Sequence, residues 1–230
     1  MLPRSQRLKG RTGRLDNNDY EGRPSTFSTP VTESGCSQVM KDEVRWENAG
    51  TEIVKLIVGR KRKEFSIHKN FICQASEAMK AAFCGEFEEG RSGVITLAED
   101  DPLVVQTFIA YCYPNFNGET LRKLEVVDLI GLYIFADKYR CINRLKNLVM
   151  DSIQDKMLVE DFTFNAEGLE RIFNNTTSSH EAPIRLYAAA LVAYTLHISP
   201  DDSWVSYVHH VLLDTPDLQI EYLSTSVRSL

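Results

Sequence analysis

Between Ile53 and Tyr113 the spacing of the apolar residues switches repeatedly between the period of a strand and the period of a helix. In order, the runs are strand-like over 52–58 and 64–67, helix-like over 71–87, strand-like over 94–97 and helix-like over 104–113. Alternating apolar residues indicate strands, and apolar residues three or four positions apart indicate amphipathic helices. The segment therefore predicts a hairpin, a helix, a strand and a helix in that order.

From Leu124 to the C-terminus the apolar spacing remains helical. Helices are expected over 124–139, from 142 to 153, around 169–173, from Pro183 to about 196, around 204–212 and from Pro216 onward. The helix that begins at Pro183 is apolar on nearly all sides, which is typical of a buried helix, so we expect it at the centre of the C-terminal region. Earlier in the chain, Phe108, Ile134 and Leu145 are expected on buried helix faces.

Composition and charge narrow the class of protein. Of 230 residues, 43% are hydrophobic and 25% are charged, which is ordinary for a globular protein that buries a sizeable core. The formal net charge of -6 argues against nucleic acid as a direct ligand, because phosphate binding depends on an excess of Lys and Arg. No apolar run approaches the roughly 20 residues of a membrane-spanning helix. Five cysteines without a CxxC pair indicate a reducing compartment, so the sequence predicts a cytoplasmic or nuclear location.

Residues 1 to about 45 differ in composition from the rest of the chain. They are rich in Arg, Ser, Thr, Gly, Pro and Asn, contain few large apolar residues and show no sustained periodicity. Such a segment cannot bury enough apolar surface to offset the entropy that is lost on ordering. The sequence predicts a disordered basic tail over 1–45, and a mitochondrial transit peptide is the alternative for its Arg-rich start.

Several joints between the predicted elements occur together in one known family. The dipeptide HK at 68–69 joins a strand to a helix, DDP at 100–102 opens the later helix, and LYIFADKYRCINRLKNLVMDSI contains the joint between a pair of helices. In this order they make the chain resemble the BTB (POZ) domain over about 46–156. The resemblance implies an α+β, mainly helical fold in which a helix cluster is capped by a short three-stranded mixed sheet. An all-helical extension over 157–230 follows, and this arrangement is most similar to short stand-alone BTB proteins of filamentous fungi.

The polar clusters favour structural roles over chemical ones. His68 lies between a strand and a helix, where BTB proteins keep a buried histidine that hydrogen-bonds backbone. The run at 60–63 matches a short nuclear-localisation or nucleic-acid patch, but a solvated hairpin turn is favoured. Asp100 and Asp101 before Pro102 fit an N-cap followed by proline at the first helical position. No phosphate-binding loop, dinucleotide fingerprint, HExxH motif or nucleophile elbow occurs, so the sequence predicts no enzyme, no metal and no cofactor.

The resemblance implies that the chain binds other proteins and has no catalysis of its own. Two functions stay open: an adaptor that recruits a client protein to a cullin-type ubiquitin ligase, and a scaffold in nuclear or transcriptional assemblies without a ligase. Cullin adaptors carry a hydrophobic-x-Glu motif after the domain, and residues 158–160 have a loosely similar composition. Dimeric BTB proteins begin with an extra strand and an amphipathic helix. The segment 37–46 lacks that apolar face, which predicts a monomer, or a dimer through another surface such as the helical extension.

The family also implies where a cullin scaffold binds: on the helix after the DDP joint, on the loop that follows it and on the paired helices. The matching positions are Val105, Tyr111, Tyr113, Asn115, Phe116, Tyr139 and Arg140. Phe116 is the expected anchor because it is an aromatic residue in a polar Pro-Asn-Phe-Asn-Gly loop, and aromatic residues are enriched among interface hot spots. The alternative is that Phe116 folds back onto the domain's own helices.

Overall fold

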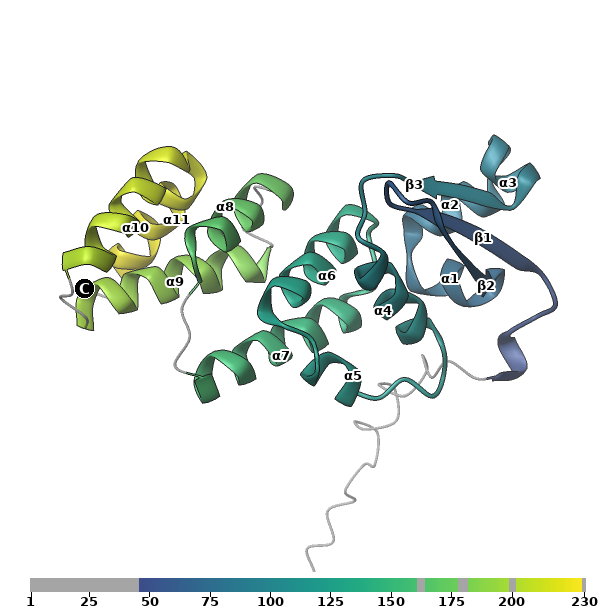
Figure 1. Ribbon diagram of the computed structural model, residues 1–230, viewed down its shortest axis with the longest axis horizontal. Helices are drawn as coiled ribbons and strands as arrows, with labels where there is room; N and C mark the ends of the chain where they lie inside the picture. The colour runs from purple at the N-terminus through teal and green to yellow at the C-terminus, as the bar shows by residue number, and fades with distance from the viewer. Residues whose placement is uncertain (1–45, 161–163, 178–181, 199–201, 229–230) are drawn as a thin grey trace, which may run out of the picture. The chain divides into compact units, whose positions relative to one another are not determined.

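The computed structural model describes residues 46–160, 164–177, 182–198 and 202–228 (Figure 1). The elements are η1 (Trp46–Asn48), β1 (Ile53–Val58), β2 (Lys63–His68), α1 (Lys69–Ala75), α2 (Glu77–Cys84), α3 (Glu88–Ser92), β3 (Val94–Leu97), α4 (Pro102–Cys112), α5 (Glu119–Arg122), α6 (Val126–Lys138), α7 (Asn143–Glu160), α8 (Ala166–Asn175), α9 (Pro183–Ile198), α10 (Asp202–Asp214) and α11 (Pro216–Arg228). Within these ranges no helix is both long and apolar enough to cross a bilayer. The tail predicted over 1–45 lies outside the described residues.

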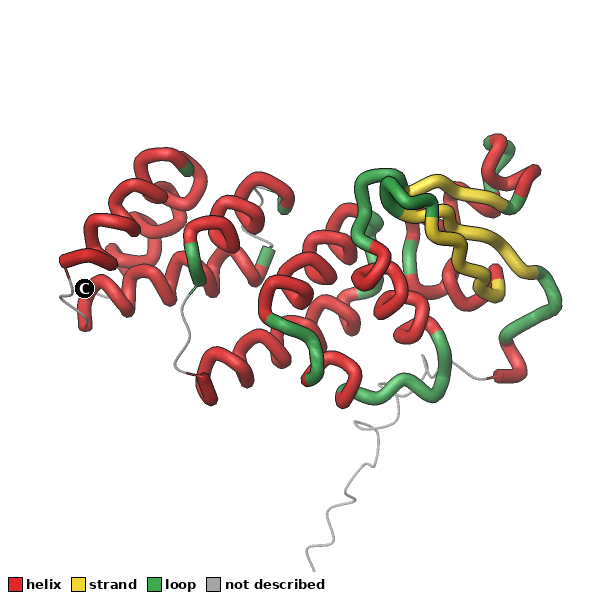
Figure 2. The backbone as a smooth tube through the Cα atoms, viewed as in Figure 1, coloured by secondary structure: helices red, strands yellow, loops and turns green. Residues whose placement is uncertain are grey.

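The three strands form one mixed sheet in the order β2-β1-β3. β1 pairs antiparallel with β2, from Ile53 opposite His68 to Val58 opposite Lys63, and it pairs parallel with β3. Three alternate side chains of β1 are buried, whereas Lys55 between them is exposed. The predicted mixed sheet and its basic turn are therefore confirmed, and Gly59 permits the turn because its φ of 69° lies in the left-handed region. The tube in Figure 2 shows these strands in yellow beside the much larger helical part.

The helical core lies where α4, α6 and α7 pack together. Phe108 of α4 and Leu145 of α7 are both fully buried, and the Phe108 ring lies 5.1 Å from that of Phe135 on α6. Ile134 is only partly buried and packs against the edge of this core. The prediction of a buried face is therefore right for Phe108 and Leu145 and only partly right for Ile134.

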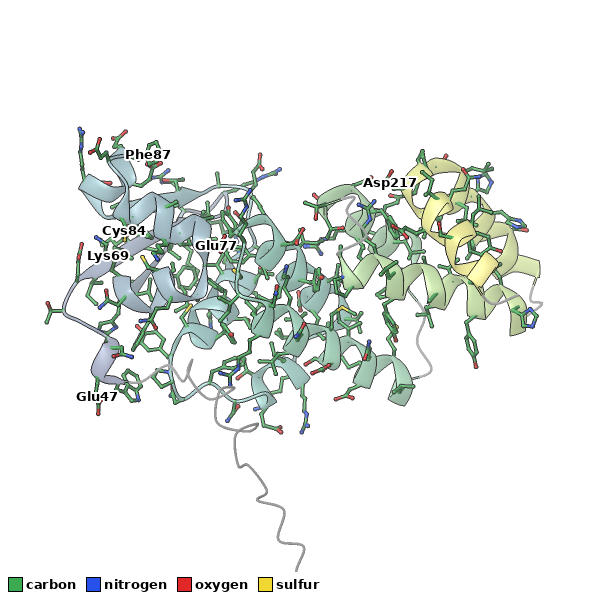
Figure 3. The ribbon with its side chains drawn as sticks, turned by 180° about the vertical axis from the view of Figure 1, so that it is seen from behind. Glu47, Lys69, Glu77, Cys84, Phe87 and Asp217 are labelled. Atoms are coloured by element: carbon green, nitrogen blue, oxygen red, sulfur yellow. The ribbon has the colours of Figure 1, made fainter. Side chains whose placement is uncertain are left out.

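The helix expected over 71–87 is broken at Ser76, which has an extended backbone with φ -146° and ψ 127°. Its buried hydroxyl accepts a hydrogen bond from the Met79 N–H at 3.2 Å, which caps α2, and donates one to the Tyr139 carbonyl at 2.6 Å. The expectation that the helix continues to Phe87 is also wrong. Phe87 does not enter the core but is 65% exposed at the N-cap of α3. Figure 3 labels this residue.

In the C-terminal region, α9 packs against α8 and α11, so the prediction of a central helix that begins at Pro183 is confirmed. Its burial is one-sided rather than complete, since Tyr194 is 63% exposed. Among the described residues, Arg185 of α9 is the largest fully buried side chain. It donates hydrogen bonds to the Thr176 carbonyl at 3.2 Å and to the Asp217 carboxylate at 2.5 Å. This buried guanidinium joins the end of α8 to the start of α9 and α11.

Candidate protein-interaction surface

The loop between α4 and α5 places the expected anchor against the domain itself. Pro114 follows the last turn of α4, and the Phe116 N–H donates to the Tyr113 carbonyl at 3.1 Å to close a tight turn. The Phe116 ring meets the Tyr111 ring edge-on at 5.4 Å and is half-buried, while Asn115 is exposed. The alternative in which Phe116 folds back onto its own helices therefore describes this loop, although part of the ring still faces solvent.

Tyr113 lies in an aromatic cluster that reaches the surface through Trp46. The Tyr113 ring is 5.6 Å from Trp46 and 5.2 Å from Phe71, and Trp46 remains 56% exposed. His68 joins the same cluster, because its Nδ1 lies 3.0 Å from the Tyr113 hydroxyl. The expected hydrogen bond from His68 to backbone is thus wrong: the partner is a phenol, and the ring is only partly buried. Trp46 was not identified from the sequence as a candidate surface residue. In the sequence it is marked only by its place at the start of the apolar pattern.

A groove runs beside this loop, between α4 and the segment 117–124. It has a volume of about 610 Å³, and its lining residues are Leu103, Gln106, Thr107, Ala110, Asn117, Glu119, Thr120, Lys123 and Leu124. Leu103 is 42% exposed and offers apolar surface at this groove, while Glu119 and Lys123 add charges of opposite sign. Buried Leu121 fixes α5 on the domain, so the wall of the groove is part of the folded structure.

Of the seven predicted contact positions, the two that lie on α4 do not face solvent. Val105 is fully buried and Tyr111 is 9% exposed, and burial raises the pKa of the Tyr111 hydroxyl to about 12. The assignment of Val105 to a binding surface is wrong, because the face of α4 that carries Val105 and Phe108 packs into the core. The solvent-facing side of α4 carries Gln106 instead.

Tyr139 and Arg140, at the end of α6, lie in a different environment from the loop. The Tyr139 hydroxyl donates a 2.6 Å hydrogen bond to the Asp100 carboxylate, which also receives the Lys138 ammonium at 3.1 Å. Burial and this contact raise the pKa of the Tyr139 hydroxyl well above its usual range. Arg140 is exposed with a φ of 48°, and its carbonyl accepts from the Glu77 N–H at 3.2 Å. Tyr113 thus packs on Trp46 and Phe116 packs on Tyr111, whereas Tyr139 contacts Asp100.

Asp100 and Asp101 have divided roles at the start of α4. Asp101 is the N-cap, and its carboxylate accepts the Leu103 N–H at 2.6 Å, with Pro102 at the first helical position. The predicted cap is confirmed for Asp101, whereas Asp100 serves the contact with Tyr139. A carboxylate at a helix N-terminus is favoured by both the unpaired N–H groups and the helix dipole. Within the described ranges, no group of three or more His, Cys, Asp or Glu side chains is placed to hold a metal ion.

Comparison with known families identifies the described fold. Residues 51–155 match the model of the BTB/POZ domain, which covers the sheet, helices α1 to α6 and most of α7. Comparison with curated proteins gives no match to this sequence. The fold of this region, a mainly helical α+β domain with a three-stranded mixed sheet, agrees with that family. The chain therefore contains a BTB/POZ domain over residues 51–155, a module that mediates protein–protein interactions.

Proposed function

We propose that this chain is an adaptor that binds a cullin-type scaffold through the loop and groove at α4 and α5, and that its helical extension holds a client protein. The observation that carries the proposal is the groove between α4 and the segment 117–124, where Leu103 offers accessible apolar surface. The half-buried Phe116 ring lies in the loop that leads into this segment. A short apolar patch between polar and charged residues has the anatomy of a protein interface, with an apolar centre and a polar rim.

The rim of this surface supports the same proposal. Asn115 is exposed at the tip of the loop, and Glu119 and Arg122 of α5 form an exposed ion pair at 2.7 Å. Exposed charges of both signs contribute little to stability but set the rate and register of association. A partner is therefore expected to place an apolar side chain in the groove and polar groups around it.

The helical extension supplies the surface proposed for the client. Leu213 of α10 is 72% exposed, and Ile220 and Leu223 of α11 are 58% and 55% exposed. Ile220 and Leu223 are three residues apart and therefore share one face of α11. These residues lie outside the segment that matches the BTB/POZ model, so the two binding functions fall on different parts of the chain.

The scaffold part of the proposal is tested by binding of a purified cullin to the full chain. Leu103→Asp places a charge in the groove and is expected to weaken the affinity by roughly tenfold or more, which is about 1.4 kcal/mol. Folding is expected to be kept, because an acidic side chain in the first turn of α4 is favoured by the helix dipole. Leu213→Asp is the matched control, since it changes a more exposed leucine of α10 and leaves the groove intact.

Equal affinities of the two variants for the cullin place the contact elsewhere and contradict the proposed surface. Absence of cullin binding by the wild-type chain removes the adaptor function altogether. The remaining function is then a scaffold in nuclear or transcriptional assemblies without ligase involvement.

A further inference from the structure

Two thiols outside the interaction surface lie next to each other. Cys73 belongs to α1 and Cys84 is the last residue of α2, and their Sγ atoms are 3.9 Å apart. Cys84 is exposed and Cys73 is partly exposed, whereas Cys112 and Cys141 are buried. Figure 3 labels Cys84 on this part of the molecule. Small reactants in solution can therefore reach the Cys73–Cys84 pair but not the two buried thiols.

We propose that Cys73 and Cys84 are a modification site, a dithiol that a hydroperoxide converts to an intramolecular disulfide. The S–S bond of a disulfide is about 2.05 Å long, so the two sulfur atoms need to approach by roughly 1.9 Å. Cys84 ends its helix and Gly85 follows it, so the backbone on that side can adjust. The bond closes a short loop around Ser76, where the chain already bends between α1 and α2.

The chemistry of the pair assigns a separate role to each sulfur. Cys84, the exposed thiol, loses its proton and attacks the terminal oxygen of the hydroperoxide, which forms a sulfenic acid and releases water or an alcohol. The Cys73 sulfur then attacks the Cys84 sulfur, the S–S bond forms, and the hydroxyl leaves with the Cys73 proton as water. Two thiols lose two electrons in total and the peroxide gains them, so the reaction is balanced.

Burial and charge around the pair agree with these roles. Burial and the neighbouring Cys84 raise the pKa of the Cys73 thiol to about 12, which makes Cys73 the slower thiol toward an oxidant in solution. The charges of Lys69 and Lys80 act in the opposite direction on the pKa of Cys73, but their effect is smaller than that of burial. Figure 3 also labels Lys69, whose ammonium is held by Glu52 at 2.9 Å. The exposed sulfur therefore reacts first and the half-buried sulfur resolves the product.

The test oxidises the full chain with hydrogen peroxide, alkylates the remaining thiols after unfolding, and analyses a tryptic digest without reduction. Trypsin cleaves after Lys69, Lys80 and Arg91, so Cys73 and Cys84 fall in separate peptides, 70–80 and 81–91. The expected product is these two peptides joined, lighter by two hydrogens than their sum, and separated again by dithiothreitol. The buried Cys112 and Cys141 serve as internal controls and are expected to be recovered alkylated.

Single variants assign the order of the two steps. Cys73→Ser is expected to leave a Cys84 sulfenic acid that dimedone traps, and Cys84→Ser is expected to slow oxidation of Cys73 by roughly tenfold. Far-UV circular dichroism verifies that both variants are folded before they are compared. The proposal is overturned if both thiols are recovered in the reduced form after peroxide treatment. It is also overturned if either thiol forms a disulfide with Cys36 or if a disulfide joins two chains.

Discussion

At the scale of single residues, the contact between Tyr139 and Asp100 shows how a residue expected at an interface is used by the fold. The Asp100 carboxylate is 11% exposed and accepts from both the Tyr139 hydroxyl and the Lys138 ammonium. A short hydrogen bond to a carboxylate is stronger than one between neutral groups. The contact ties the end of α6 to the residues just before α4, and it holds the Tyr139 ring in place.

Tyr139→Phe is expected to lower the free energy of unfolding by about 1.5 kcal/mol, because it removes a hydrogen bond to a charged group while Lys138 still neutralises Asp100. The effect depends on pH in a defined direction. The pKa of Tyr139 is raised in the folded state, so the stabilisation is complete below about pH 10, where tyrosine ionises in an unfolded chain, and is lost as the pH rises further. Urea unfolding at pH 7 and at pH 10.5 measures both effects.

The difference in stability between wild type and Tyr139→Phe is therefore expected to shrink at the higher pH. Tyr194→Phe is the control, since that side chain is 63% exposed and its hydroxyl is expected to contribute nothing measurable. A difference that grows with pH contradicts a raised pKa for Tyr139.

The loop at the candidate surface could be predicted from the sequence, whereas the side chains of α4 that face solvent there could not. The loop with Asn115 and Phe116 could be predicted, because proline and glycine interrupt the helical spacing there. Which side chains of α4 face solvent could not, because α4 is apolar nearly all round, and Val105 was assigned to the wrong face. Trp46 lies far from Tyr113 in sequence, so only the folded structure brings the two rings together.

At the scale of elements, Ser76 determines where α1 ends and α2 begins. The apolar residues on both sides of Ser76 keep helical spacing, so periodicity alone predicted one helix through this position. The Ser76 hydroxyl makes two hydrogen bonds at the break, one of them to the Tyr139 carbonyl 63 residues away, and Ser76 also forms a backbone bridge with Cys141. A local pattern contains no information about such a distant acceptor, which is why this boundary was missed. Asp101 and Pro102, whose capping is local, were predicted correctly.

Ser76→Ala is expected to destabilise the domain by about 2 kcal/mol, which combines the loss of a helix cap with the loss of a buried hydrogen bond. The Tyr139 carbonyl keeps only a long hydrogen bond of 3.4 Å from the Ala78 N–H. Ser66→Ala on the exposed side of β2 is the control and is expected to change the stability by less than about 0.5 kcal/mol. Thermal unfolding of both variants gives the comparison, and equal midpoints show that the cap contributes nothing.

At the scale of the whole described molecule, the BTB/POZ domain and the helical extension are continuous. The boundary predicted after residue 156 falls inside α7, which runs without interruption from Asn143 to Glu160. α8 packs on α6, and the Arg171 guanidinium donates to the Val127 carbonyl at 3.3 Å. Sequence composition separates the tail from the rest, but it does not show this contact between α6 and α8. The extension is therefore expected to unfold together with the domain.

A substitution at Gly131 of α6 tests whether the domain and the helical extension unfold together. A Cβ atom at Gly131 lies 2.9 Å from the terminal guanidinium nitrogen of Arg171 on α8 and 3.1 Å from Val104 on α4. A larger side chain therefore displaces the Arg171 guanidinium and crowds Val104. Gly131→Val is expected to cost about 1–3 kcal/mol and to lower the unfolding midpoint of the whole unit in a single transition. Pulsed hydrogen exchange along a denaturant series, followed in peptides of α4 and of α9, measures whether both parts lose protection at the same midpoint. Gly118→Val is the control, because a Cβ at Gly118 has no neighbour within 4 Å. If α9 loses its protection while α4 keeps the wild-type midpoint, the extension is a separate folding unit that α6 only touches.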